Sequence, residues 1–242
     1  MNKTAEKNPE NYIRRKVLII GAGGSLGREI SLQFGTDDYP LILAGRSLEK
    51  LHKTRESVFN DNPKAKISCY TLDYTDPKTL IHFAKKIKEK EIELSIVINT
   101  AAGFYKGKFQ DMDTYQLNNL ISSNYTGIIL LLKELFPVLK NSPFSDIINI
   151  TSISSATTLD TSRSSSAHIA TKSALHLFDN VLSRELSQEG FRITTIAPST
   201  LAKKGREGIP MDILAKLVKQ IVELPPVIRI ESLAVFYTGY KN

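Results

Sequence analysis

The sequence contains a single cysteine, Cys69, among its 242 residues. One cysteine cannot form an intrachain disulfide, and such sparing use of cysteine suits a reducing compartment. The first sixteen residues, MNKTAEKNPENYIRRK, are polar and lack the apolar centre of a secretory signal. We therefore expect a soluble protein of the cytoplasm.

Long apolar runs and concentrated charge of one sign are also missing. The longest apolar runs, such as 128–132, are far shorter than the ~20 residues that span a bilayer as a helix. The net charge of +7 is spread along the chain, with the densest basic runs at 85–88 and 203–206. We interpret these runs as solvated helix faces or mobile loops, because nucleic-acid-binding proteins gather their charge into a patch or stripe. The expected partners therefore include no membrane and no nucleic acid.

Short β-branched runs alternate with amphipathic helical stretches along the chain. The first run, KVLII at 16–20, is continuously apolar and stops at a glycine, which is typical of a buried parallel strand. Similar runs occur at 41–44, 67–72, 94–99, 147–151 and 192–196, and helical stretches at 25–34, 48–60, 77–90, 114–140 and 166–189. Because parallel neighbours need crossover helices, the alternation predicts an α/β protein with a Rossmann-type, three-layer, doubly wound parallel sheet.

The length suits one domain, and no internal repeat or long linker divides the chain. We expect a flexible polar arm at 1–14 and a single domain at 15–242. Within that domain, a segment at about 200–226 is predicted to cover the substrate. It contains an amphipathic helix at 209–224, and the stretch VIRIESLAVF at 227–236 is expected to be a last edge strand.

Two helix boundaries carry local signals. Asp76 followed by Pro77 predicts an N-cap with proline in the first turn of the helix. Gly190 stands where the helix at 166–189 would need a left-handed residue at its C-terminus.

Glycines follow the first predicted strand at every third position. Gly21, Gly24 and Gly27 form a G-x-x-G-x-x-G loop that leads into the first predicted helix. A loop in this position places free helix N–H groups where the pyrophosphate of a dinucleotide can rest. We expect the cofactor to contact Gly21, Gly24, Ser25 and Leu26.

The end of the second predicted strand indicates which dinucleotide is bound. An acidic residue there would bind the ribose hydroxyls and repel a 2′-phosphate, whereas an arginine attracts that phosphate. The chain has Arg46 and Ser47 at this position and no acid. The sequence therefore predicts NADP(H) in preference to NAD(H), the alternative being that Arg46 is a solvated surface residue.

Five segments, in this order, resemble the short-chain dehydrogenase/reductase family. They are the glycine loop, Asn99-Thr-Ala-Ala-Gly103, Asn124-Tyr-Thr-Gly127, Asn149-Ile-Thr-Ser152 and His168-Ile-Ala-Thr-Lys172. The resemblance covers about 15–200 and implies an oxidoreductase that uses a nicotinamide dinucleotide on a small-molecule carbonyl or alcohol. It also implies further cofactor contacts, at Asp73 and Tyr74 for the adenine, and at Asn99, Ala101, Lys172, Pro198 and Thr200.

The resemblance implies catalytic roles for four residues. Ser152 would polarise the carbonyl, Lys172 would bind the ribose and lower the pKa of the acid, and Asn124 would hold a water in the proton relay. The position of the family's tyrosine is occupied by His168, four residues before Lys172 and therefore on the same helical face. Ser165 is not the equivalent, because the residue four positions further on is Ile169.

Two functions are compatible with this histidine. In the first, the protein is an NADPH-dependent carbonyl reductase in which His168 donates the proton. In the second, it binds the cofactor without catalysis and acts as a sensor or partner subunit. Besides the missing tyrosine, the second is supported by Ser25 in the glycine loop and by Pro198-Ser199, where the family has Pro-Gly.

Two further expectations concern ligands and partners. A metal site at His168 and His176 is not expected, because no carboxylate or cysteine stands at a matching distance. The predicted helices at 114–140 and 166–189 carry more apolar surface than one sheet contact needs, and family members commonly associate through these helices. We therefore expect a homodimer or homotetramer.

Overall fold

The computed structural model describes residues 15–91, 93–105, 107–156 and 165–239, and the predicted arm at 1–14 lies outside these ranges. Within them, seven parallel strands form one sheet in the order β3-β2-β1-β4-β5-β6-β7. The strands are β1 (Lys16–Ile20), β2 (Leu41–Gly45), β3 (Ile67–Thr71), β4 (Leu94–Asn99), β5 (Ser145–Ile150), β6 (Phe191–Pro198) and β7 (Ser232–Val235). The order reverses between β1 and β4, which confirms the predicted doubly wound sheet.

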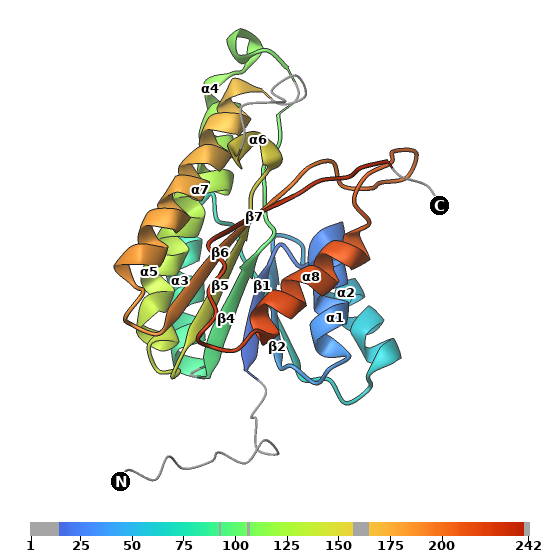
Figure 1. The fold of residues 1–242 in the computed structure, drawn as a ribbon, viewed down its shortest axis with the longest axis vertical. Coiled ribbons are helices and arrows are strands. Elements are labelled where there is room, and N and C mark those ends of the chain that lie inside the picture. Colours follow the sequence, from blue (N-terminus) through green and yellow to red (C-terminus); the bar gives the residue numbers. More distant parts are fainter. Residues whose placement is uncertain (1–14, 92, 106, 157–164, 240–242) are drawn as a thin grey trace.

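Helices cover both faces of the sheet, so the molecule has the three predicted layers (Figure 1). One face carries α1 (Ser25–Gly35), α2 (Leu48–Asp61) and α8 (Met211–Glu223), and the other carries α3 (Pro77–Lys90), α5 (Gly127–Leu139) and α7 (Ser166–Glu185). The shorter helical segments are η2 (Phe109–Asp111), α4 (Thr114–Ile121), η3 (Ser122–Thr126) and α6 (Ile153–Ala156).

Strand β1 shows why the strand runs are continuously apolar. Leu18 and Ile20 pack into the core beneath α3 and α5, whereas Val17 and Ile19 pack into the core beneath α1 and α8. Successive side chains of a strand point to opposite faces of the sheet. A strand enclosed by two helix layers therefore favours apolar residues on both of its faces.

The predicted start of α3 is confirmed. The Asp76 side chain accepts a hydrogen bond from the Lys78 N–H at 2.9 Å, and Pro77 occupies the first turn. The helix predicted at 209–224 is also present as α8. The edge strand predicted within 227–236 is shorter, because β7 pairs with β6 only over Ser232–Val235.

The prediction for the end of α7 is wrong in its position. The helix ends at Glu185, four residues before the predicted end. Gly190 has the expected left-handed conformation, with a φ of +76°, but it lies directly before β6. A Cβ at Gly190 would come within 2.8 Å of the Pro143 carbonyl oxygen. The entry into the strand, and not the end of the helix, therefore requires this glycine.

The helix predicted at 114–140 is interrupted. A π-helical turn, Ser122–Thr126, joins α4 to α5 and contains the buried Asn124. Gly127 follows this turn, and a Cβ there would overlap the Tyr74 carbonyl oxygen. Periodicity alone cannot reveal this turn, because its causes lie in contacts with distant parts of the chain. Such turns inside α-helices often occur at functional sites.

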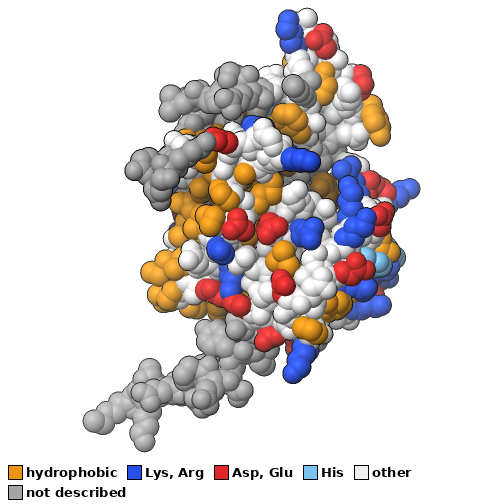
Figure 2. Space-filling model, turned by 90° about the vertical axis from the view of Figure 1, so that its right-hand side faces the viewer, with side chains coloured by type: hydrophobic (Ala, Val, Ile, Leu, Met, Phe, Trp, Pro, Cys, Tyr) orange, Lys and Arg blue, Asp and Glu red, His pale blue; other side chains and the backbone are white. Residues whose placement is uncertain are grey.

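Charges of both signs are mixed on the side of the molecule that carries α1, α2 and α8 (Figure 2). Several of them form ion pairs, such as Lys53 with Glu49 at 2.6 Å and Lys216 with Asp212 at 3.8 Å. Both pairs are exposed and link successive turns of one helix, so each contributes little to stability. Among the described helices, none has the length and apolar character needed to cross a membrane.

Candidate active site

A cavity of about 980 Å³ lies at the carboxyl ends of the strands, where the crevice of an open α/β sheet is expected. Its wall is built from the loop after β1, the ends of β4 and β5, the start of α7 and the segment after β6. The predicted site residues on this wall are Gly24, Ser25, Leu26, Ser152, His168, Lys172, Pro198 and Thr200. The structure thus brings together residues more than 170 positions apart in the sequence.

The glycine loop leaves room and donors for an anion. Gly21 has a φ of +84°, and a Cβ there would lie 2.7 Å from Thr100 Oγ1. Gly24 is the N-cap of α1 and supplies no side-chain acceptor, and the first turn contains no acid. The first N–H groups of the helix are therefore free to bind a phosphate. A Cβ at Gly27 would overlap the Gly21 carbonyl oxygen, so this glycine allows the helix to pack on the loop.

A second cavity, of about 320 Å³, is lined by Arg46, Asp73 and Tyr74 together with residues of the β4 loop and α4. Arg46 is exposed and forms no ion pair with the described part of the chain. Burial raises the pKa of the Tyr74 hydroxyl, and the neighbouring charges of Arg46 and Asp73 act on it in opposite directions. Three residues predicted to hold the adenosine end of a cofactor are thus adjacent.

Ser47 and Asp73 also have local structural roles. Ser47 is the N-cap of α2, and its Oγ accepts a hydrogen bond from the Lys50 N–H at 3.3 Å. This capping role was not recognised in the sequence. Its hydroxyl proton is still available to a ligand. Asp73 Oδ1 accepts from the N–H and the Oγ1 of Thr75, at 3.0 and 2.7 Å, which fixes the turn after β3.

The end of β4 and the turn after it contain Asn99 and Ala101, two of the predicted cofactor contacts. Thr100 and Ala102 line the large cavity, whereas Asn99 and Ala101 are buried behind it. Asn99 Oδ1 accepts from the Ala101 N–H at 3.1 Å, so this asparagine shapes the turn. Thr100 was not singled out in the sequence, although strict alternation along β4 would have placed it on the side opposite Asn99.

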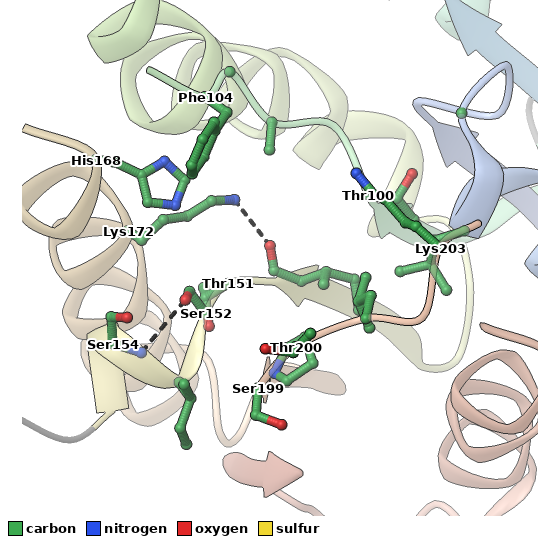
Figure 3. A pocket seen from close by; sticks show the side chains of 18 of the residues that line it. Thr100, Phe104, Thr151, Ser152, Ser154, His168, Lys172, Ser199, Thr200 and Lys203 are labelled. Atoms are coloured by element: carbon green, nitrogen blue, oxygen red, sulfur yellow. Dashed lines mark hydrogen bonds between the residues drawn. The ribbon is translucent and has the colours of Figure 1, made fainter. Parts of the chain in front are cut away.

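Lys172 is the most deeply buried charged residue of the cavity wall, with 2% of its surface exposed. Its Nζ donates to the Ile150 carbonyl oxygen at 3.0 Å (Figure 3). Burial lowers the pKa of Lys172 to about 8, and the charge of Asp179 partly opposes this effect. The lysine can therefore change its protonation state close to neutral pH.

His168 lies one turn before Lys172, and Figure 3 shows both side chains projecting from α7 into the same space. Its ring packs edge-on against Phe104, with the centroids 5.2 Å apart. The buried Nδ1 has no hydrogen-bond partner among the described residues. Burial is the main cause that lowers the pKa of His168, the charge of Lys172 lowers it further, and a backbone hydrogen bond with Gly103 opposes both. The imidazole is therefore mostly neutral at pH 7.

Asn124 connects the π turn to the wall of the cavity. Its Oδ1 accepts from the Gly103 N–H at 2.8 Å, and its Nδ2 donates to the Gly103 carbonyl and to Thr171 Oγ1, each at 3.1 Å. The same Gly103 bonds to His168. The Asn124 side chain thus positions the loop that holds the imidazole, a role that the sequence did not indicate.

Ser152 follows β5 and lines the cavity. Its Oγ accepts a weak hydrogen bond from the Ser154 N–H at 3.3 Å, and its carbonyl accepts from the Ser155 N–H at 2.9 Å. Both contacts belong to the first turn of α6. The hydroxyl proton of Ser152 is not used in them and can be donated to a ligand.

The segment after β6 forms part of the cavity wall. The Ser199 N–H donates to the Val235 carbonyl at 2.8 Å, and its Oγ accepts from the Tyr237 N–H at 2.9 Å. Ser199 therefore binds the chain that follows β7, which accounts for a hydroxyl at this position. Thr200 accepts at its Oγ1 from Arg206 Nη2 at 3.3 Å.

A basic hairpin follows Thr200. The backbones of Lys203 and Arg206 exchange two hydrogen bonds, of 3.1 and 2.8 Å, around Gly205, whose φ is +74°. Lys203 and Arg206 both line the large cavity. From the sequence, the basic run at 203–206 was interpreted as a solvated helix face or a mobile loop, within the segment predicted to cover the substrate. Within the segment predicted to cover the substrate, α8 contributes Met211 alone to the cavity wall, and its buried face packs on the core with α1.

His176 does not share a ligand with His168. Its Nε2 lies 3.1 Å from Ser232 Oγ, and its Nδ1 lies 3.4 Å from Ser155 Oγ. Across the described ranges, no group of three or more histidine, cysteine, aspartate or glutamate side chains is placed to hold a metal ion.

Comparisons with known proteins agree with this architecture. Residues 15–210 match the family model for short chain dehydrogenases. An uncharacterized oxidoreductase of Staphylococcus aureus (strain MW2) is 27% identical over 181 residues, which are 75% of this chain and 75% of that protein. A similar oxidoreductase of Staphylococcus saprophyticus is 26% identical over 187 residues, 77% of this chain and 78% of the relative.

Solved structures share the fold at lower identity. A metagenomic short-chain oxidoreductase in complex with NADP has a TM-score of 0.81 and 21% identity, with 92% of this chain and 96% of that chain covered. An alcohol dehydrogenase from the archaeon Thermococcus sibiricus, complexed with 5-hydroxy-NADP, has a TM-score of 0.82 and 20% identity over 95% and 99% of the two chains.

Proposed function

Because the chain belongs to the short-chain dehydrogenase family, we propose that it reduces a carbonyl group of a small molecule with NADPH. The observation that carries the proposal is the meeting of Ser152, His168 and Lys172 on the wall that also contains the free N-terminus of α1. The family makes the protein an oxidoreductase. The cofactor preference, the direction of the reaction and the roles of these residues are our proposal.

The residues of the cavity fit a phosphate-bearing cofactor. The described lining includes the cations Lys172, Lys203 and Arg206 and no aspartate or glutamate. The diphosphate would rest on the N–H groups that follow Gly24, in the space left by the missing side chains of the loop. Arg46 would hold the 2′-phosphate, which is the support for NADP(H) over NAD(H). Two proteins that share the fold were solved with NADP or a derivative of it.

The cofactor, when bound, supplies the hydride that reduces the carbonyl carbon. The carbonyl oxygen must then be stabilised and protonated as it becomes an alcohol. The Ser152 hydroxyl would donate a hydrogen bond to this oxygen, and His168, in the position of the family's tyrosine, would donate the proton. Lys172 would bind the ribose hydroxyls and keep a positive charge beside the oxygen. Asn124 would hold a water that returns a proton to the site.

Titration of NADPH binding by fluorescence, followed by NADPH consumption across a panel of carbonyl compounds, tests the proposal. Binding together with turnover supports it, and a failure to bind NADPH contradicts it. Binding without turnover, in the wild type and in His168→Tyr alike, favours the second function, a cofactor-dependent sensor or partner subunit. The observation behind that alternative is the lowered pKa of His168, which leaves few protonated imidazoles at neutral pH.

A homodimer or homotetramer in the cytoplasm completes the proposal. Leu177 and Val181 of α7 and Tyr115 of α4 are exposed apolar side chains on the helices where association is expected. Burial of such residues between two copies stabilises an interface. Light scattering at micromolar concentration should therefore report a dimer or a tetramer, and Leu177→Lys should lower the mass. A monomeric wild type would contradict this part of the proposal.

A further inference from the structure

A chain of hydrogen bonds runs behind the cavity and ends on a buried carboxylate, Asp179. Asn99 Nδ2 donates to Asn149 Oδ1 at 3.1 Å, and Asn149 Nδ2 donates to Asp179 Oδ1 at 2.8 Å. Thr195 Oγ1 donates to the other oxygen, Oδ2, at 2.7 Å. Asp179 is 1% exposed, so water does not supply further partners from the surface. The carboxylate is thus buried, and its hydrogen-bond partners in the described part of the chain are neutral groups.

Among the described residues, one charge acts on Asp179, and it is that of Lys172 on the same helix. Strands β5 and β6 face it with the neutral Asn149 and Thr195. His176, one turn earlier on α7, is directed to Ser155 and Ser232 instead. No lysine or arginine of the described chain forms an ion pair with Asp179. A buried carboxylate without a contacting cation is costly to keep charged, so its position calls for an explanation.

Lys172 has the complementary environment. It lies seven residues before Asp179, which places both on one side of α7, two turns apart. Its contact on β5 is the carbonyl of Ile150, the residue that follows the Asn149 bound to Asp179. Asp179 is the charge that acts on Lys172, and no carboxylate touches the ammonium in the described structure. The two residues therefore contact adjacent residues of the same strand, and their opposite charges act on each other without direct contact.

We propose that Asp179 is a positioning residue that keeps Lys172 protonated and fixes the strand segment 149–150 against which the lysine rests. Through Lys172, it sets the upper limit of the pH range in which the site binds its cofactor. The part that concerns the cofactor rests on the proposed function, whereas the effect on Lys172 does not.

The protonation behaviour of the two groups supports this arrangement. Burial raises the pKa of Asp179 to about 7, while the hydrogen bonds of Thr195 and Asn149 and the charge of Lys172 oppose the rise. Burial lowers the pKa of Lys172 to about 8. Both groups are therefore mostly charged between about pH 7 and 8. Loss of the negative charge would lower the pKa of the lysine further, because an opposite charge stabilises the charged form.

The direct test is an NMR titration of the lysine side chain in protein labelled with ¹³C at the lysine ε carbons, with the signal assigned through Lys172→Met. The Lys172 midpoint should lie near pH 8 in the wild type. In Asp179→Asn, which keeps the shape and the hydrogen-bonding capacity, it should fall by about one pH unit. Asp212→Asn, an exposed site on α8, is the matched control and should leave the midpoint unchanged.

Thr195→Val is a second variant that keeps the carboxylate. It removes one hydrogen bond that favours the charged form of Asp179, so the Lys172 midpoint should fall in the same direction by a smaller amount. This variant provides the answer if Asp179→Asn does not fold. A Lys172 midpoint that is the same in the wild type and in the folded variant would overturn the proposal.

The consequence for the cofactor is measured separately. The pH above which NADPH affinity is lost should fall in Asp179→Asn by the same amount as the Lys172 midpoint, with unchanged affinity at pH 6. A shift of the Lys172 midpoint without a shift in NADPH affinity would overturn the role in cofactor binding. A wild type that does not bind NADPH at all would contradict the proposed function and not the pairing, because the NMR titration needs no cofactor.

Discussion

Two clusters of buried charges lie at opposite ends of β5 and β6, and they are built in opposite ways. At the amino-terminal ends, Asp146 receives both Nε and Nη2 of Arg192, at 2.7 and 2.9 Å, and Nη1 of Arg15 at 2.6 Å. At the carboxyl ends, Lys172 Nζ donates to one backbone carbonyl, and Nδ1 of His168 has no hydrogen-bond partner within the described ranges. Near one end of these strands the charges are closely paired, with Nε of Arg15 as the exception among the described residues, and near the other end the charges, which α7 carries, are underpaired.

The difference separates charges that stabilise the fold from charges that are available for chemistry. Arg192 also donates to the carbonyls of four residues near the end of α8, so it fastens this helix to the sheet. A fully bonded charge of this kind has no capacity left for a ligand. An underpaired buried group costs stability, about 1–3 kcal/mol when a donor or acceptor is left unsatisfied, and it concentrates at sites of binding or catalysis.

The largest effect is expected on the rate of reduction, from a substitution in the underpaired cluster. His168→Phe should lower the rate of reduction by at least about 100-fold, since a positioned general acid contributes on the order of 10²–10⁴, while NADPH binding persists. In the wild type the rate should fall as pH rises, with a midpoint below about 6.5, because the imidazole must be protonated and burial lowers its pKa from that ordinary value. Steady-state rates between pH 5 and 8 measure both.

His82→Phe on the exposed side of α3 is a suitable control and should behave as the wild type. An active His168→Phe enzyme would show that the proton comes from elsewhere, such as Tyr105 or a water held by Asn124. In that case the absence of a partner at His168 would have no connection with catalysis.

A substitution in the closely paired cluster should lower the stability of the fold instead of the activity. Asp146→Ala leaves two guanidinium groups buried without their anion, which should lower the free energy of unfolding by about 3–5 kcal/mol. Urea denaturation measures this, with Asp212→Ala as an exposed control that should change stability by less than about 1 kcal/mol. The affinity of the folded variant for NADPH should be unchanged. A loss of NADPH affinity in Asp146→Ala would contradict the separation between a cluster that stabilises the fold and a cluster that serves binding.

Arg46 extends the comparison to the surface, because it lines the second cavity and forms no ion pair with the residues that the structure describes. Arg46→Ala should weaken NADPH binding relative to NADH by about 1.5–3 kcal/mol, the contribution of one charge-assisted phosphate contact. Fluorescence titration with both cofactors gives the ratio. Arg28→Ala serves as the control, because the Arg28 guanidinium binds Ser57 and lines neither described cavity. An unchanged ratio in Arg46→Ala would show that the arginine is only a solvated surface residue.

The sequence predicts the fold well because the fold depends on local patterns. The apolar run before Gly21, the cap at Asp76 and the helical spacing of His168 and Lys172 each act over a few residues, and each has the expected conformation. Residues that line the cavity could also be predicted where a strand ends, because parallel strands end at the same edge of the sheet.

The remaining features depend on contacts between distant segments. The pairing of Asn124 with Gly103 spans 21 residues, and that of Thr195 with Asp179 joins a strand to a helix. Neither contact produces a periodic pattern in the sequence. Lys203 shows the same limit, since only the hairpin around Gly205 places this ordinary surface residue type on the cavity wall.

The π turn between α4 and α5 constrains the length of this part of the chain. It constrains the identity of the residues less strictly. A π turn holds one residue more than an α turn, and each residue rotates the helix by about 100°. Within this turn Asn124 faces Gly103. After the turn, the apolar side chains of α5, beginning with Ile128, face the sheet. Deleting one residue from Ser122–Thr126 would rotate one of these faces away from its partner, whereas an exposed residue such as Thr126 can be exchanged. Among relatives of this chain, alignment gaps are therefore expected to avoid this segment even where its residues differ.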